Sequence, residues 1–459
     1  MSFRKGFVWG SASASYQVEG AAFEDGKGLS VWDMLSHQPG KIHANENGDV
    51  ACDHYHRYQE DVNLMQNMGL QAYRMSISWP RVIPDGIGKV NEKGLDFYDR
   101  LIDKLLASQI TPWVTLFHWD YPYSLFLKGG WLNPDSPKWF EEYTKVIINR
   151  FSDRVTHWIT QNEPQCYIGL GHYDGDHAPG LKMGLKEMLL ANHHSMIAHG
   201  LSVQAIRANC KRPAKIGAAP IGIVCIPETN SLEDIKAAEK ASFMIRKPDE
   251  WNTTLFVDPI LLGKYPDDAF EVFKGLMPSI KDSELKTMCQ PLDFFGANFY
   301  KSEVVRSDGN GGAETVCEHS GIAKTLMNWY LSPESLYYGP KFLQNRYKLP
   351  IVITENGLAN MDWINDEGKV PDPQRIDYMT RYLKQLKKAA KEGVDIQGYF
   401  HWCVMDNFEW ALGYSKRFGL IHVDFRTQKR TPKESSFWFK KVIQSNGEIL
   451  GEPTLDPRI

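Results

Sequence analysis

Two kinds of stretch alternate along the chain: short apolar runs and longer runs with helical periodicity. The short runs predict buried β-strands. Eight of them occur, at residues 7–15, 72–78, 111–119, 155–162, 214–222, 293–300, 350–356 and 396–403. Between them, stretches such as 57–69 and 92–110 carry apolar residues at i, i+3, i+4 and i+7, as amphipathic helices do. This alternation favours a single (β/α)8 barrel over residues 1–459, and a doubly wound α/β sheet is the alternative.

Polar side chains gather where the predicted strands end. They are Gln17, Arg74, His118, Trp119, Asn162, Glu163, Asn298, Tyr300, Glu355 and Trp402. In a (β/α)8 barrel the carboxyl ends of the strands converge on one face, where active sites are built. A doubly wound sheet would spread the same side chains along an edge. The pattern therefore favours the barrel, with an active site at the C-terminal ends of its strands.

Composition narrows the choice of partners. The chain has 459 residues and a formal net charge of −4 without a basic stripe, which argues against nucleic acid and anionic membranes. Its start, MSFRKGFVWG, lacks the apolar core of a signal peptide, and no run of about 18 apolar residues occurs. The seven cysteines are odd in number and form no CxxC pair, as is typical of reduced thiols. We expect a cytoplasmic protein, and a homo-oligomer is compatible with these features.

Aromatic residues are unusually common, at 12% of the chain. Many lie beside Asp, Glu, His or Asn, as in FHWD, SISWPR and DNFEW. Tryptophan in such surroundings often lines a wet cleft, where it can stack on the apolar face of a sugar. The other interpretation, that these are large core residues, is equally compatible with the counts alone.

Two glutamates occupy nearly the same context at the ends of two predicted strands. Glu163 lies in TQNEP and Glu355 in TENG, each beside an asparagine. Glycoside hydrolysis needs two carboxyl groups that flank the scissile bond, about 5–5.5 Å apart in retaining enzymes. A single glutamate at a strand end is more often a solvated surface charge. Two at matching strand ends favour a catalytic pair.

Three motifs in this order resemble glycoside hydrolase family 1, the β-glucosidase family. They are FVWGSASASYQVEGA at 7–21, Asn-Glu-Pro at 162–164 and IVITENGLA at 351–359. The resemblance implies a (β/α)8 barrel that works without cofactor or metal and hydrolyses with net retention. It makes Glu163 the acid/base and Glu355 the nucleophile.

The resemblance also assigns supporting and sugar-binding residues. Arg74 and Tyr300 match the residues that contact the nucleophile, so Arg74 should keep Glu355 ionised and Glu163 should have the raised pKa. The matched sugar-binding residues are Gln17, His118, Trp119, Asn162, Asn298, Trp402, Glu409, Trp410 and Phe418. On the aglycone side Trp329 matches an aromatic platform, whereas Gln165 stands where the family commonly has tryptophan.

Glu409 bears on the choice of sugar. Relatives that act on 6-phosphoglycosides generally lack a carboxylate at this position, and a carboxylate would repel a phosphate dianion. We therefore expect hydrolysis of terminal non-reducing β-D-glucosyl residues from cello-oligosaccharides and from aryl or alkyl β-glucosides. β-Galactosidase and β-fucosidase side activity and transglycosylation are also expected. A 6-phospho-β-glucosidase and a non-catalytic sugar-binding barrel are the alternatives.

Overall fold

Eight parallel strands close into a barrel in the computed structural model, which describes residues 2–317 and 321–451. The strands follow one another around the barrel in the order β1-β11-β10-β7-β5-β4-β3-β2. They span β1 Val8–Ala12, β2 Ala72–Ser76, β3 Thr111–Phe117, β4 His157–Asn162, β5 Lys215–Ala219, β7 Phe294–Asn298, β10 Ile351–Asn356 and β11 Ile396–Trp402. Each of the eight predicted runs contains one of them. The barrel prediction is confirmed, and the doubly wound alternative is wrong.

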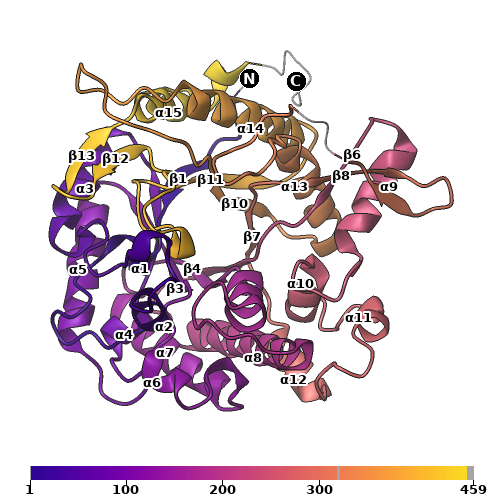
Figure 1. Cartoon of the computed structure of the whole chain (residues 1–459), viewed down its shortest axis with the longest axis horizontal. Coiled ribbons are helices and arrows are strands. Elements are labelled where there is room, and N and C mark those ends of the chain that lie inside the picture. Colours follow the sequence, from indigo (N-terminus) through magenta and orange to yellow (C-terminus); the bar gives the residue numbers. More distant parts are fainter. Residues whose placement is uncertain (1, 318–320, 452–459) are drawn as a thin grey trace.

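Helices surround the barrel strands, which lie in the middle of the molecule (Figure 1). The helices between and after the first strands are α1 Ser15–Val18, α2 Val31–Ser36, α3 His54–Asn67, α4 Trp79–Val82, α5 Glu92–Ala107, α6 Tyr123–Phe126, α7 Ser136–Phe151 and α8 Leu185–Asn209. The later ones are α9 Leu232–Phe243, α10 Thr253–Leu261, α11 Asp267–Val272, α12 Asp282–Met288, α13 Ser335–Tyr347, α14 Pro373–Lys391 and α15 Glu434–Gln444. A π-helical segment over Gln165–Asp174 follows β4 directly.

Helix α5 shows why the periodic stretches fold as helices. Its apolar positions, among them Leu95, Leu101 and Leu105, are buried against the barrel, so the helix is stabilised mainly by packing of one face. The predicted helix over 92–110 is too long at its end. The backbone at Gln109 is left-handed (φ 61°), which ends the helix before the next strand.

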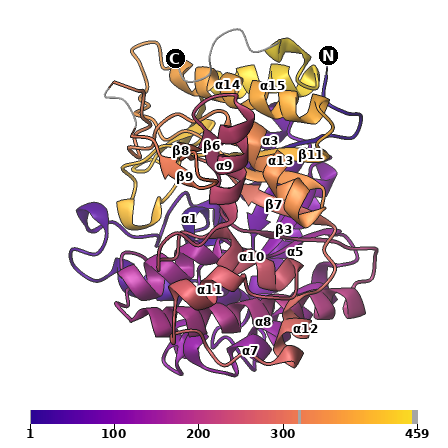
Figure 2. The ribbon, with the colours of Figure 1, turned by 90° about the vertical axis from the view of Figure 1, so that its right-hand side faces the viewer.

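Two small sheets lie outside the barrel and were not predicted. Between β5 and β7 the chain forms β6 Cys225–Pro227, which pairs with β8 Glu303–Ser307, and β8 pairs in turn with β9 Ala313–Thr315. This sheet and helices α9 to α12 form the side of the molecule that faces the viewer in Figure 2. The second sheet is a hairpin of β12 Ile421–Asp424 and β13 Lys429–Pro432.

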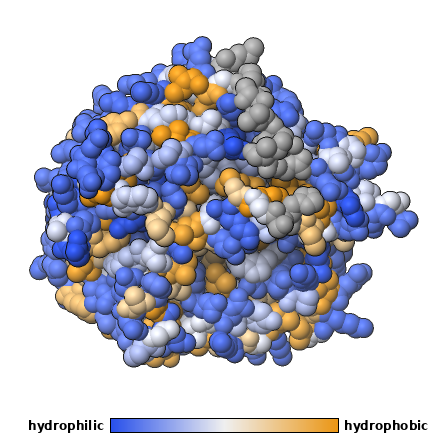
Figure 3. Space-filling model, turned by 45° about the horizontal axis from the view of Figure 1, so that its top comes forward, coloured by the Kyte–Doolittle hydropathy of each residue, from blue (hydrophilic) through white to orange (hydrophobic). Residues whose placement is uncertain are grey.

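The face shown in Figure 3 is mostly hydrophilic, with apolar residues in separate small groups. No helix in the described part of the chain is both long enough and apolar enough to cross a bilayer. The assignment of residues 1–459 to one domain stays a prediction, since its ends, residues 1 and 452–459, lie outside the described residues.

Candidate active site

The carboxyl ends of β4, β7, β10 and β11 carry predicted polar residues into one cluster, and Arg74 joins them from the middle of β2 rather than from its predicted place at the strand end. Asn298 is the last residue of β7, and Glu355 pairs with it in register from β10. Glu163 follows Asn162, the last residue of β4. Because the strands are parallel and form a closed barrel, residues remote in sequence meet at one mouth.

Glu355 is held by the two side chains predicted to support it. Its side chain is only 4% exposed. Arg74 Nη1 donates to one carboxylate oxygen at 2.5 Å, and the Tyr300 hydroxyl donates to the other at 2.7 Å. Both oxygens are therefore fixed by donors that favour the ionised carboxylate.

Glu163 has a different environment. The residue is 6% exposed, and its carboxyl group contacts an amide and a thiol. Asn298 Nδ2 donates to Oε1 at 2.8 Å, and Cys166 Sγ lies 3.4 Å from Oε2. The backbone at Glu163 is left-handed (φ 44°), a conformation uncommon outside glycine, and its N–H donates to the Ala219 carbonyl at 2.8 Å. This turn at the end of β4 directs the side chain into the mouth.

A short hydrogen-bonded chain joins the two carboxyl groups. Arg74 Nη2 donates to Asn162 Oδ1 at 2.5 Å, and Asn298 Nδ2 donates to the same oxygen at 3.0 Å. The chain therefore runs from Glu355 through Arg74, Asn162 and Asn298 to Glu163. All five side chains are buried. Such a network fixes the relative position of the carboxyl groups, since no member can turn without breaking a bond.

Burial and neighbouring charges set the pKa values of the pair. Burial, and then the charge of Glu355, raise the pKa of Glu163 to about 8. Burial also raises the pKa of Glu355, and Arg74 and Tyr300 act in the opposite direction. The prediction of a raised pKa at Glu163 is confirmed. The expected effect of Arg74 is present, but it does not prevail over burial in the net shift of the Glu355 pKa.

Aromatic rings and an imidazole form one wall of the site. The His118 ring stacks with Trp402 and Trp410, at centroid distances of 5.7 and 5.9 Å. Trp119 packs on Trp410 at 4.5 Å, and its indole N–H donates to the Asn162 carbonyl at 2.9 Å. Burial, with the nearby Arg74, holds the pKa of His118 well below its usual value, so the imidazole is neutral.

Gln17 and Glu409 meet on another wall. Gln17 Nε2 donates to the Phe408 carbonyl at 2.7 Å and lies 3.4 Å from Glu409 Oε2. Among the described residues Gln17 Oε1 has no hydrogen-bond partner, although it is buried. Burial, followed by the charges of Glu355 and Glu163, raises the pKa of Glu409 to about 8. Gln17 Oε1 is thus an acceptor available to a bound hydroxyl group.

The residues predicted for the aglycone side differ in their placement. Trp329 is half-buried and packs on Tyr300 at 5.3 Å, and Phe418 meets the same tyrosine edge-on at 6.2 Å. Gln165 is 0% exposed, and its Oε1 accepts from the Ile221 N–H at 3.3 Å. Every other predicted site residue forms a hydrogen bond or a ring contact with another member of the set, whereas among the described residues the side chain of Gln165 forms its hydrogen bond with Ile221, outside the set.

The contact between Cys166 and Glu163 was not predicted. The Cys166 N–H donates to the Glu163 carbonyl at 2.9 Å, which folds the segment after β4 back on itself. This turn brings the thiol to a carboxyl oxygen three residues earlier in the chain. A helical turn after Asn-Glu-Pro would have been the signal in the sequence, because residues i and i+3 share a face.

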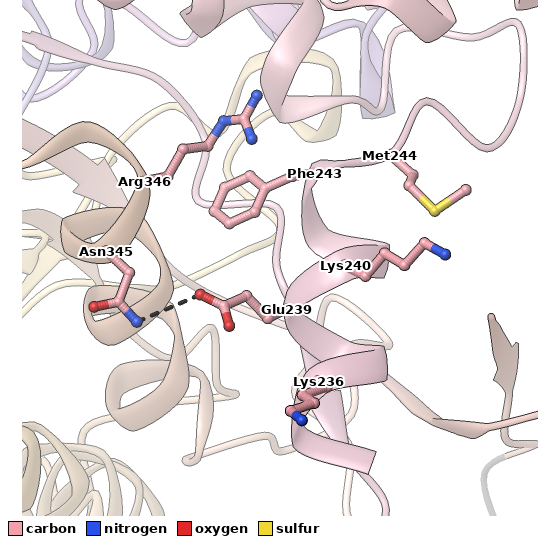
Figure 4. Close-up of a pocket in the computed structure, with 7 residues that line it drawn as sticks. All are labelled: Lys236, Glu239, Lys240, Phe243, Met244, Asn345 and Arg346. Carbon is pink, nitrogen blue, oxygen red and sulfur yellow. Dashed lines mark hydrogen bonds between the residues drawn. The ribbon is translucent and has the colours of Figure 1, made fainter. Parts of the chain in front are cut away.

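A separate hollow of about 500 Å³ lies outside the barrel, between α9 and α13 (Figure 4). It is lined by Lys236, Glu239, Lys240, Phe243, Met244, Asn345 and Arg346. Its one lining carboxylate, Glu239, accepts from Asn345 Nδ2 at 3.4 Å. The hollow therefore has no carboxyl pair among these described residues, in contrast to the mouth of the barrel.

Comparison with known proteins agrees with the geometry of the mouth. The model of the family described as glycosyl hydrolase family 1 matches residues 1–448. A 1,4-beta-D-glucan glucohydrolase of Thermotoga neapolitana is 44% identical, over 97% of this chain and 99% of that protein. Beta-glucosidase A of Acetivibrio thermocellus is 45% identical with the same coverage. The structure of a Thermotoga maritima beta-glucosidase in complex with glucoimidazole superposes with a TM-score of 0.89, at 42% identity, over 97% of this chain and 99% of that one.

Proposed function

The chain belongs to glycosyl hydrolase family 1, and from this premise we propose that it is a retaining β-glucosidase acting on terminal non-reducing β-D-glucosyl residues. The observation that carries the proposal is that two buried carboxyl groups at the mouth of the barrel have different hydrogen-bond partners. Glu355 is fixed by a guanidinium and a phenol, whereas Glu163 has an amide and a thiol. This difference supports a nucleophile and an acid/base, which need opposite protonation states at one pH.

Glu355 is the nucleophile in this proposal. Its carboxylate attacks the anomeric carbon of the bound sugar, and the bond to the leaving oxygen breaks. Arg74 and Tyr300 hold the carboxylate in one orientation, so little reorganisation is needed when the covalent glycosyl-enzyme forms. Their contacts with both oxygens support this role.

Glu163 is the acid and then the base. With a pKa near 8 it keeps its proton in neutral solution and gives it to the leaving oxygen. Once Glu355 is esterified its negative charge is gone, and the repulsion that raises the pKa of Glu163 falls. Glu163 can then take a proton from the water that attacks the intermediate.

The walls of the mouth fit a sugar ring. Gln17 Oε1, buried and without a partner among the described residues, can accept a bond from a sugar hydroxyl. The neutral His118 beside Trp402 and Trp410 offers hydrogen bonding next to stacking faces. We assign Gln17, His118, Trp119, Asn162, Trp402, Glu409, Trp410 and Phe418 to the glycone. Asn298 already bonds Glu163 and Asn162, so its predicted contact with sugar would be additional.

A 6-phosphoglycoside is the weaker alternative. In the described part of the chain Glu409 forms no ion pair with lysine or arginine, and its nearest ionisable neighbours include Glu355 and Glu163. A phosphate dianion here would be taken out of water beside buried carboxyl groups and would lack a compensating cation from Glu409's described ion-pair partners, which is costly whether or not those carboxyl groups are protonated. Rates on cellobiose and on its 6-phosphate separate the two functions, and a preference for the phosphate would overturn this one.

The stereochemistry of the first product is the decisive experiment. A β-glucoside is hydrolysed in an NMR tube, and the anomer that appears first is recorded before mutarotation. β-Glucose supports retention, whereas α-glucose would exclude Glu355 as a covalent nucleophile. Parallel assays with aryl β-galactosides and β-fucosides, and with high acceptor concentrations, test the proposed side activities and transglycosylation.

A cytoplasmic location is also proposed, which the seven unpaired thiols support.

A further inference from the structure

We propose that Cys166 is a positioning residue for the acid/base carboxyl, through its thiol contact with Glu163 Oε2. The inference rests on the proposed role of Glu163 in hydrolysis. The new element is the role of the thiol. A thiol is a weak hydrogen-bonding partner, so it can stay beside the carboxyl group of Glu163 in both of its protonation states.

The segment that follows β4 holds the thiol in place. The Cys166 N–H bonds the Glu163 carbonyl at 2.9 Å, and the π-helical run over Gln165–Asp174 continues from this turn. Cys166 is buried, with 6% of the residue exposed, so the rotation of its side chain is restricted by packing. Its Sγ lies 3.4 Å from Glu163 Oε2, within the range of a thiol hydrogen bond.

The two oxygens of Glu163 differ in their partners, and this difference places the proton. Oε1 accepts from the Asn298 amide at 2.8 Å, and an amide N–H can only donate. A proton on Oε1 would therefore face another donor. The transferable proton belongs on Oε2, the oxygen that faces Cys166.

A thiol is a weak donor and a weak acceptor. When Glu163 is ionised, the S–H group can donate to Oε2. When Glu163 is protonated, the sulfur does not compete strongly for the proton. A hydroxyl group here would stabilise the ionised carboxylate more and would hinder the acid step, since donors to a carboxylate lower its pKa.

Other charged or titratable groups also face this pair and must stay constant in a test. They are Glu355 on β10, Arg74 on β2, Tyr300 after β7, Glu409 after β11, and Glu250 on the Cys166 side. Burial raises the pKa of the Cys166 thiol, and the charge of Glu163 adds to the effect. The thiol therefore keeps its proton across the working range and remains a donor.

The test compares Cys166→Ala with Cys166→Ser. The readout is the basic limb of the kcat/KM profile on cellobiose, whose poor leaving group needs the acid. Loss of the donor should raise the pKa of Glu163, so the limb of Cys166→Ala should move to higher pH by about half a unit. The limb of Cys166→Ser should lie at or below that of the wild type, because a hydroxyl is the stronger donor.

Cys225→Ser serves as the matched control, since Cys225 is a buried thiol in β6 whose amide and strand contacts lie outside the mouth. It should leave the profile unchanged. The proposal is overturned if Cys166→Ala does not move the limb, or if the alanine and serine variants move it equally. If Cys166→Ala destabilises the fold, the Cys166→Ser variant alone tests the proposal. A basic limb of Cys166→Ser at higher pH than that of the wild type overturns it.

The companion measurement keeps the two proposals apart. Azide rescue of Glu163→Ala on an activated aryl glucoside reports the acid/base role directly and does not involve the thiol. If rescue occurs while the Cys166 variants behave as wild type, only the role of Cys166 is lost. If rescue fails, the assignment of Glu163 itself is wrong.

Discussion

Arg74 on β2 and Glu355 on β10 form a buried ion pair, although β1 and β11 lie between their two strands in the barrel. The arginine therefore reaches across the mouth rather than along a strand. From there it also donates to Asn162 Oδ1, next to the proposed acid/base. A planar guanidinium can serve both acceptors at once, which a single ammonium group cannot do equally well.

Loss of Arg74 should disable the nucleophile. Arg74 acts to lower the pKa of Glu355, so Arg74→Met should raise that pKa further and leave less of the attacking carboxylate. The acidic limb of the kcat/KM profile should move to higher pH, and the maximum should fall by at least about a hundredfold, or roughly 2.7 kcal/mol. Arg74→Lys, which keeps the charge, should shift the limb less. An acidic limb that stays in place in Arg74→Met would contradict the assignment.

Removal of Glu355 should abolish turnover irrespective of the leaving group. In Glu355→Ala no covalent intermediate can form, so rates on aryl glucosides and on cellobiose should both fall by several orders of magnitude. A 2-fluoro-sugar with a good leaving group should label the wild-type chain on the peptide that contains Glu355. Mass spectrometry of the digested protein identifies that peptide, and a label elsewhere would exclude the role.

Removal of Glu163 should depend on the leaving group. Glu163→Ala should lose far more activity on cellobiose than on an activated aryl glucoside, because only the poor leaving group needs a proton. Azide should restore turnover and give β-glucosyl azide. In the wild type, the pKa of about 8 places the loss of the acid above neutral pH, so kcat/KM on cellobiose should fall as pH rises through 8. Equal losses on both substrates without rescue would argue against Glu163.

The strands could be predicted from the sequence because each is a short apolar run that the barrel buries. β10, over Ile351–Asn356, is buried at every position and ends in the polar residues of the site. The sheet that begins with β6 could not be predicted, since three residues, Cys225–Pro227, carry no periodic pattern. Its pairing with β8 depends on the path of a long connection.

The candidate site was predictable where a motif fixes a residue at a strand end. Glu163 and Glu355 are of this kind, whereas Arg74 lies in the middle of β2. The net pKa shifts were harder to predict from the sequence, because the shift at Glu355 depends on a degree of burial that only the closed barrel provides. The contact between Cys166 and Glu163 also depends on the turn after β4, for which the i, i+3 spacing after Asn-Glu-Pro is the one signal in the sequence.

Gln165 gives the final prediction, because its burial changes what a substitution should do. Since the family commonly has tryptophan here on the aglycone wall, the sequence alone predicts that Gln165→Trp improves kcat/KM for apolar aglycones a few-fold. In the structure the side chain is 0% exposed and accepts from the Ile221 N–H. A larger indole would have to displace packed neighbours, at a cost of about 1–3 kcal/mol. We therefore expect Gln165→Trp to lower Tm by several degrees.

A substitution at Trp329 provides the comparison that decides whether residue 165 lies in the packed interior or faces the aglycone cleft. It is half-buried beside Tyr300, so it can offer a face to the aglycone. Trp329→Ala should reduce kcat/KM for aryl aglycones roughly three- to tenfold, as expected for one lost aromatic contact, with little change in the glucose-to-galactose preference. Both variants are measured by thermal unfolding and on a series of aryl and alkyl β-glucosides. If Gln165→Trp keeps the wild-type Tm and improves apolar aglycones, residue 165 faces the cleft, because an indole that fits without cost cannot occupy a packed interior.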